Sequence, residues 1–163
     1  MDIIKNWDFI RQHFSKSFRS NFYVSIASVD INNNPTVTPI GSLFLNDNQT
    51  GFYFEKFAVK LSKNADSNPN ICVLGVNSNR WFWIKSLFKG KFTNPPAIKL
   101  YGKLGEKRKA TTKEIERLNR RMRATKSLKG NAYLWKKMDS IRDIKFTSAE
   151  QINLGKMTTI KNI

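Results

Sequence analysis

Lys60 and the residues around it have the types and order that suit anion binding. Lys60 stands just inside a short predicted helix, residues 58–65, which follows a strand and ends near Asn68-Pro69. The start of a helix presents backbone N–H groups that have no intrahelical partner, and a nearby lysine adds positive charge. A phosphate or another anion is therefore favoured there.

A second cluster mixes large aromatic rings with cations: Arg80-Trp81-Phe82-Trp83, followed by Lys85. Indole faces stack on planar ligands, and a guanidinium or ammonium group can meet an acidic group of a substrate. Arg and Trp are also enriched at protein interfaces that hold no ligand. Arg80, Trp81 and Trp83 are thus candidates for a substrate wall or a partner-subunit wall, and the alternative is a core patch.

Catalysis by side chains alone has little support in the sequence. No glycine-rich dinucleotide fingerprint, Walker loop or nucleophile elbow is present, and the 12 acidic residues form no paired arrangement. His13 and Cys72 are the only residues of their types, so neither a zinc site nor a histidine triad is predicted. We assign no catalytic residue and no metal, and a cofactor would have to supply the chemistry.

The charge is strongly basic, with 29 Lys and Arg against 12 Asp and Glu, a net charge of +17 and a pI near 10.2. Such a surface attracts phosphorylated ligands, nucleic acid or anionic membranes. Much of the excess lies between Lys99 and Lys129, on a basic amphipathic helix. No zinc pattern or RNA-binding signature accompanies it, so a solvated helix face is the alternative to nucleic-acid binding.

The positions of these groups depend on a series of short strands. Apolar and β-branched runs separated by Asn-rich turns predict strands at residues 22–29, 36–45, 52–55, 71–76 and 97–104, and another from Ile141. Pro39 and Gly41 favour an edge position, a bulge or a close ligand approach in the second strand. This spacing is typical of an antiparallel barrel or sandwich.

Helical spacing predicts an N-terminal helix over about residues 2–18 and a basic helix over about 112–126, which Thr111 and Glu114 cap. Residues 77–96 are interpreted as an excursion between strands, and residues 131–138 remain undefined. A single domain, 1–163, is predicted. The sequence contains no membrane-spanning run and no signal-peptide pattern at its start, so we expect a cytoplasmic protein.

The ordered series N-P-x-V-x-P-I-G, G-F-Y-F, K-L-S-K-N and N-P-N-I-C-V, in residues 34–73, resembles the FMN-binding split-barrel proteins, the pyridoxamine 5′-phosphate oxidase family. The resemblance covers roughly residues 22–124. It implies a mainly β fold, a six-stranded Greek-key split barrel with flanking helices. It also implies a homodimer with one FMN in each of two grooves between the subunits.

The same resemblance implies roles for individual residues. Lys60 would hold the FMN phosphate, with Thr38 supporting it through its hydroxyl at the place of the family's strand arginine. Pro39 and Ile40 would pack on the flavin ring, and the segment around Tyr53 would line the phosphate and ribityl chain. The candidate cofactor-binding residues are Thr38, Pro39, Ile40, Tyr53, Phe54, Glu55, Val59 and Lys60.

Two departures from the family shape the functional prediction: Thr38 replaces the arginine, and Ala97 replaces a glutamine that contacts the flavin. The end of the chain also lacks a substrate segment of the oxidase type. We therefore expect an FMN-dependent oxidoreductase for a small substrate, anionic substrates included, and not the true oxidase. The alternatives are a non-catalytic module for haem (with His13 as the one available histidine), for another planar ligand or for none, and a basic nucleic-acid-associated protein.

Overall fold

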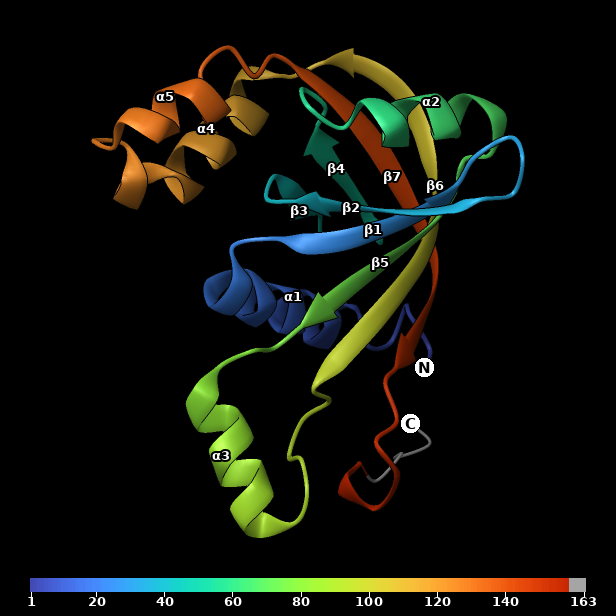
Figure 1. Ribbon diagram of the computed structural model, residues 1–163, viewed down its shortest axis with the longest axis vertical. Helices are drawn as coiled ribbons and strands as arrows, with labels where there is room; N and C mark the ends of the chain where they lie inside the picture. Colours follow the sequence, from blue (N-terminus) through green and yellow to red (C-terminus); the bar gives the residue numbers. More distant parts are fainter. Residues whose placement is uncertain (159–163) are drawn as a thin grey trace.

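The computed structural model describes residues 1–158, in which seven antiparallel strands form one curled sheet (Figure 1). The spatial order is β2-β1-β5-β6-β7-β4-β3. The strands are β1 (Val24–Val29), β2 (Pro35–Ile40), β3 (Leu43–Leu45), β4 (Thr50–Phe54), β5 (Asn70–Val76), β6 (Ala97–Lys109) and β7 (Ser140–Gln151).

The prediction of six strands was wrong by one, because the strand expected over residues 36–45 is two strands. The chain breaks at Gly41, where a Cβ atom would lie 3.1 Å from the Phe22 carbonyl oxygen and 3.2 Å from the Trp135 ring. The chain leaves β2 at one edge of the sheet and enters β3 at the other. Of the three alternatives that Pro39 and Gly41 favoured, the edge position is the one observed for β2.

The long strands β6 and β7 give the sheet its curl. Their register shifts between Tyr101 and Gly102 and again between Leu104 and Lys107. Gly102 permits the first shift, since a Cβ there would come within 2.6 Å of the Lys145 carbonyl oxygen. Such irregularities increase local twist and bend the strands. Besides pairing with each other, β6 pairs with β5 near its start and β7 pairs with β4 near its start.

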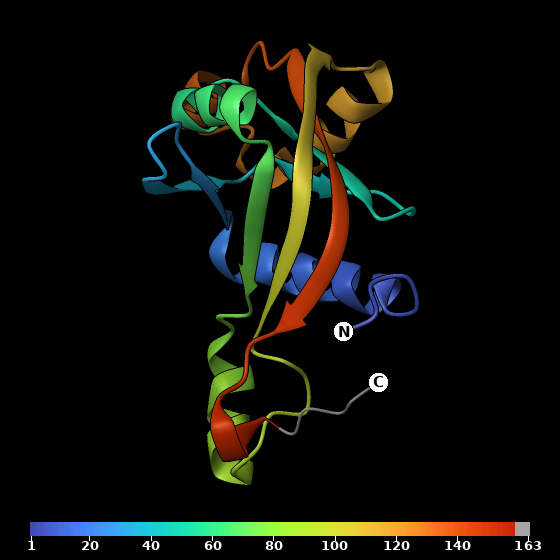
Figure 2. The same ribbon diagram turned by 90° about the vertical axis from the view of Figure 1, so that its right-hand side faces the viewer.

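Helix α1 (Trp7–Asn21) crosses one side of the sheet and packs there through Ile10 and Phe14 (Figure 2). It begins at Trp7 and not at residue 2. The reason is local: the Asp2 carboxylate accepts hydrogen bonds from the Ile4 and Lys5 amides and holds residues 3–6 in turns. The predicted aromatic stripe is correct, but the predicted boundaries are early.

The other helices are α2 (Val59–Ser67), α3 (Arg80–Lys89), α4 (Thr112–Arg121) and α5 (Lys129–Trp135), with 3-10 turns at Arg123–Thr125 and Gly155–Met157. The capping box of Thr111 and Glu114 is confirmed. The basic helix predicted to residue 126 ends as an α-helix at Arg121 and continues only as the 3-10 turn.

The excursion over residues 77–96 contains α3, which the prediction did not include. The Asn79 side chain accepts a hydrogen bond from the Phe82 amide at 3.0 Å, and Gly90 ends the helix with φ of 62°. Both are standard helix-boundary residues. The undefined region 131–138 overlaps α5. None of the helices in residues 1–158 has the length and apolar character needed to span a membrane.

Candidate functional site

The start of α2 is positively polarised and carries Lys60. Its N-cap residue Ala58 has no side-chain acceptor, and no acidic residue lies in the first turn. The Val59 amide donates to the Phe57 carbonyl at 2.9 Å, but within residues 1–158 the amides of Lys60 and Leu61 have no acceptor. The Lys60 side chain is exposed. This helix end therefore offers two N–H groups and an ammonium group to an anion.

Asn64 fixes α2 against the first hairpin of the sheet. Its side-chain amide donates to Ser28 Oγ at 2.9 Å on β1 and to Thr36 Oγ1 at 3.0 Å on β2. The buried side chains of Leu61 and Ala65 pack into the core on the same side of the helix. Lys60 is thus placed by a rigid contact between α2 and the hairpin that carries Thr38.

The electrostatics agree with this placement. The pKa of Asp30, in the turn of the β1–β2 hairpin, is lowered first by hydrogen bonds from Asn34 and also by the charge of Lys60. No ion pair of Lys60 is formed within residues 1–158. Its ammonium group is close enough to influence the hairpin and remains available to a ligand.

The predicted residues of β2 are divided between the two sides of the strand. Thr38 is half-buried opposite Ile26, and Pro39 is exposed opposite Ser25. Ile40 belongs to the hydrophobic core. Of these three residues, Thr38 and Pro39 present accessible surface, whereas a ligand would meet at most the margin of Ile40.

Tyr53 and Glu55, predicted to line the cofactor, belong to a buried polar network. The Tyr53 hydroxyl donates to Glu55 Oε1 at 2.8 Å, and Arg142 Nε donates to the same oxygen at 2.8 Å. Arg142 also donates to Ser62 Oγ at 3.2 Å and to the Gly105 carbonyl at 3.0 Å. We call these five residues the Glu55–Arg142 network. It joins β4, β6 and β7 to the first turns of α2.

The network holds Glu55 ionised despite its burial. Burial would raise the pKa of Glu55, but hydrogen bonds from Arg142 and Tyr53 and the charges of Arg142 and Lys107 outweigh it and lower that pKa. Lys107 Nζ lies 3.7 Å from Glu55 Oε2. Burial and the neighbouring Glu55 charge raise the pKa of Tyr53, which therefore stays a neutral donor.

Arg142 is the charged member of this network that the sequence did not predict. It lies opposite Tyr53 in the pairing of β4 with β7, so only the strand register brings it to Glu55 and α2. The sequence shows a basic residue within the run IRDIKF, but it does not show that the side chain of this residue points inward. Because Glu55 neutralises it, Arg142 does not simply replace the arginine expected at Thr38. Phe54, the third predicted residue of β4, packs in a separate core cluster with Phe44 and Phe52.

The predicted wall on α3 is distant from α2 within one chain. Figure 1 shows α3 at the opposite end of the molecule from α2, α4 and α5. The Trp83 indole donates to the Asn77 carbonyl at 2.7 Å and packs edge-on against Phe92. Arg80 and Trp81 are exposed. The structure therefore does not bring Arg80, Trp81 and Trp83 together with Lys60 in a single subunit.

A wide cleft lies between α1 and the pair α4 and α5. Its volume is about 1070 Å³. Apolar side chains supply much of its wall, including Phe18, Leu43, Leu128 and Trp135. None of the residues predicted to bind the cofactor lines it. It is a second concave surface with the size of a ligand site.

Arginines of two helices line this cleft: Arg117 and Arg121 of α4, and Arg11 and Arg19 of α1. Arg121 Nη1 donates to the carbonyls of Leu43 and Gly41 at 2.6 and 3.2 Å, and its guanidinium lies 3.6 Å from the centre of the Phe44 ring. Arg117 donates to Asn46 Oδ1 at 2.8 Å and to the Leu45 carbonyl at 3.0 Å. Neither arginine of α4 has an ion pair with a carboxylate within residues 1–158.

Burial is the largest effect on Arg121: together with the nearby charge of Arg117, it lowers the pKa of Arg121 to about 10. The group still carries its proton at neutral pH. Its positive charge is partly removed from water, so an anion in the cleft would be attracted strongly. The sequence identified the basic helix but not that Arg117 and Arg121 turn inward.

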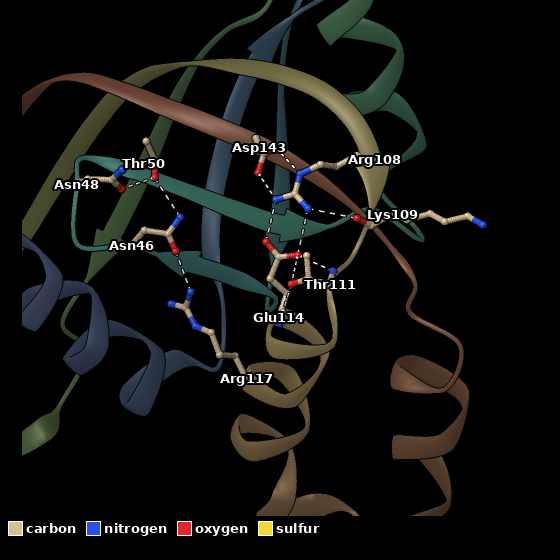
Figure 3. A network of polar contacts seen from close by, with 9 residues as sticks. All are labelled: Asn46, Asn48, Thr50, Arg108, Lys109, Thr111, Glu114, Arg117 and Asp143. Carbon is tan, nitrogen blue, oxygen red and sulfur yellow. Dashed lines mark hydrogen bonds and ion pairs between the residues drawn. The ribbon is translucent and has the colours of Figure 1, made fainter.

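Figure 3 shows how α4 is held in place. Arg108 donates to Asp143 Oδ2 at 2.6 Å and to Glu114 Oε1 at 2.8 Å, and it thereby joins β6 and β7 to the first turn of α4. Arg117 reaches Asn46, whose amide donates to Thr50 at 3.0 Å. Polar contacts at the first turn and in the middle of this helix therefore position Arg117 beside the cleft.

The curled sheet and its helices define a split barrel, the mainly β fold class that the sequence predicts. The sequence matches no protein-family model and no curated protein. Solved structures, in contrast, match most of the chain at low sequence identity. The comparisons therefore concern the fold.

An FMN-binding protein from Syntrophomonas wolfei subsp. wolfei is 12% identical, with a TM-score of 0.60 over 94% of this chain and 96% of that chain. A candidate pyridoxamine 5′-phosphate oxidase from Lactobacillus delbrueckii is 14% identical, with a TM-score of 0.52 over 85% and 90%. HutZ, a haem storage protein from Vibrio cholerae, is 12% identical, with a TM-score of 0.57 over 86% and 92%. The predicted pyridoxamine 5′-phosphate oxidase-like split barrel is confirmed as the fold.

Proposed function

We propose that this chain binds FMN and acts as a flavin-dependent oxidoreductase on a small substrate. The observation that carries the proposal is the start of α2, where Lys60 lies beside two backbone N–H groups that have no acceptor within residues 1–158. This arrangement suits a phosphate monoester. The similarity of fold to an FMN-binding protein supports the choice of ligand.

Within this proposal the residues have distinct roles. Lys60 and the α2 amides bind the phosphate, and the Thr38 hydroxyl donates to it from β2. The Glu55–Arg142 network lies beneath α2 and holds its first turns rigid through Ser62. The bound flavin would supply the electron transfer. No residue is assigned a catalytic role.

The proposal includes a homodimer, because a flavin held only by the start of α2 would leave its ring without a second wall. A partner subunit would supply that wall, from residues other than Arg80, Trp81 and Trp83 of α3. Sedimentation velocity on the purified protein tests the assembly. A protein that remains monomeric when loaded with FMN would remove this part of the proposal.

Replacement of Lys60 by alanine tests the phosphate site. Loss of one charge-assisted contact is expected to weaken FMN affinity by about ten- to a hundredfold. Titration of FMN, followed by quenching of its fluorescence, measures the change. Lys63→Ala is the matched control, because Lys63 is an exposed lysine one turn further along the same helix.

The Lys63→Ala variant should bind FMN as the unchanged protein does. Equal affinities for the Lys60→Ala variant and the unchanged protein would exclude this phosphate site. A colourless protein that fails to take up added FMN would exclude flavin binding altogether.

A second candidate function is binding of a planar anionic ligand such as haem in the cleft between α1 and α4. Arg117, Arg121 and the ring of Trp135 favour it, and the fold is similar to that of a haem storage protein. His13 is a poor axial ligand, because its Nε2 lies 2.9 Å from the Gly75 carbonyl oxygen inside the core and the residue does not line this cleft.

Titration with hemin, followed by its Soret band, separates the two sites. If the cleft binds hemin, Arg121→Gln should weaken binding by about tenfold or more, through loss of a partly buried charge. Lys60→Ala should leave hemin affinity unchanged. The opposite pattern would place the planar ligand at α2, and no hemin binding would remove this candidate.

A further inference from the structure

The outer face of α3 is apolar and exposed. Trp81, Ile84 and Phe88 follow one another at intervals of three and four residues, so they form a stripe that Leu87 widens. Trp81 is 70% exposed, Leu87 65% and Phe88 89%. A helix with this composition is normally covered.

The inner face of the same helix is already occupied by its own segment. The ring centres of Phe82 and Phe92 are 5.5 Å apart, and those of Trp83 and Phe92 are 5.1 Å apart. Ser86 is buried, and its hydroxyl donates to the Phe82 carbonyl at 2.7 Å. These contacts fix which side of α3 faces outward. The apolar stripe is therefore a defined surface of a folded helix.

Cations flank the stripe, and acids are missing from this part of the chain. No Asp or Glu occurs between Asp66 and Glu106. The exposed basic residues of the helix and its following turn are Arg80, Lys85, Lys89 and Lys91. None of these four forms an ion pair within residues 1–158.

The position of α3 leaves this face accessible. Figures 1 and 2 show the helix beyond the ends of the long strands β5, β6 and β7, away from α2, α4 and α5. The 3-10 turn Gly155–Met157 lies beside it, where the Phe92 amide donates to the Met157 carbonyl at 2.8 Å. Residues 77–96, here called the α3 arm, thus project from one end of the barrel.

The charge of the outer face of α3 distinguishes between two obvious binding partners, a second copy of this chain and an anionic lipid surface. A second copy of this chain would bring a net charge of +17 toward four cations. Seven of the twelve acidic residues already form ion pairs within their own chain, so few remain to receive these cations. An anionic lipid surface matches both properties of the face, since it accepts apolar side chains below a layer of phosphates.

We propose that the α3 arm docks the protein on an anionic lipid bilayer. Trp81, Ile84, Leu87 and Phe88 enter the boundary between headgroups and acyl chains. Arg80, Lys85, Lys89 and Lys91 lie among the lipid phosphates. The helix lies along the surface, and the barrel stays outside the bilayer.

Sedimentation of the full chain with vesicles tests the proposal. Vesicles of phosphatidylcholine alone are compared with vesicles that also contain phosphatidylglycerol, at low and high salt. Binding is expected only with the anionic vesicles, and salt should weaken it. Failure to bind the anionic vesicles at low salt would overturn the proposal.

Paired variants locate the contact. Trp81→Ser with Phe88→Ser should reduce partitioning by about tenfold or more, whereas Tyr133→Ser changes an equally exposed ring on α5 and should have no effect. Lys85→Gln with Lys89→Gln should reduce it by roughly fivefold per charge. Lys113→Gln with Lys126→Gln has the same net charge and should reduce it less. Equal losses in both charge pairs would mean attraction without a docked helix.

A positional readout separates insertion from a contact between copies. Quenching by brominated lipids should be strong in the unchanged protein and much weaker in Trp81→Phe, which retains an apolar ring. Sedimentation velocity without lipid tests for the contact between copies. Conversion of a dimer to a monomer by the Trp81→Ser and Phe88→Ser pair would identify the face as a subunit interface and overturn the proposal.

Discussion

Beneath α2, the guanidinium of Arg142 lies inside the barrel against Glu55, whereas on α3 the ammonium groups of Lys85 and Lys89 face solvent beside exposed rings. In the first region each charge has a partner and each polar atom contributes to holding strands and helix together. In the second, neither the cations nor the apolar side chains have partners among the residues that the structure describes. The comparison separates groups that stabilise the fold from groups available to a ligand or a surface.

The largest effect on stability is expected when the Glu55–Arg142 network is broken. Glu55→Gln leaves the buried guanidinium without its counter-charge, and loss of one partner of a buried pair costs about 3–5 kcal/mol. The free energy of unfolding from urea titration measures it. Glu106→Gln, an exposed change nearby, should stay within about 0.5 kcal/mol. A small effect at Glu55 would mean that water reaches Arg142.

The pH dependence sharpens the same comparison. The pKa of Glu55 is lower in the folded protein than its ordinary value of 4.5. As pH falls below that value, the unfolded chain takes up the proton first, so stability is lost progressively until pH passes the folded pKa. Above pH 4.5 the contribution is fully present.

Unfolding measured against pH in the unchanged protein and in Glu55→Gln isolates this contribution from other acids. The two stabilities should differ by a constant amount near neutral pH and converge in acid. A difference that stays constant down to low pH would show that the charge of Glu55 does not contribute.

The sequence predicted the elements whose signals are local. The capped start of α4 at Thr111, the edge character of β2 around Pro39 and Gly41, and the short helix with Lys60 all depend on residues within a few positions of one another. The ordered motifs also led to the correct fold. These features needed no knowledge of which distant strands pair.

What the sequence could not predict depends on register and on the direction of side chains. Arg142 reaches Glu55 only because β7 pairs with β4 in one register. Arg121 looked like part of a solvated basic face, but the helix packs so that its guanidinium covers Phe44. The α3 helix was missed because its aromatic residues lie on both faces, Phe82 and Trp83 against Phe92 and Trp81 and Phe88 toward solvent, so the sequence shows no contrast between an apolar and a polar face.

The smallest expected effect on stability tests the second half of the comparison. Trp81→Ser with Phe88→Ser removes side chains that are 70% and 89% exposed, so little buried apolar area is lost. The free energy of unfolding should change by no more than about 0.5 kcal/mol per site, measured by urea titration without lipid. A much larger loss would mean that these rings are covered in the free protein, by another copy or by the chain itself. An unchanged stability would mean that the apolar face of α3 contributes nothing to folding, and that its binding properties can be altered independently of the Glu55–Arg142 network.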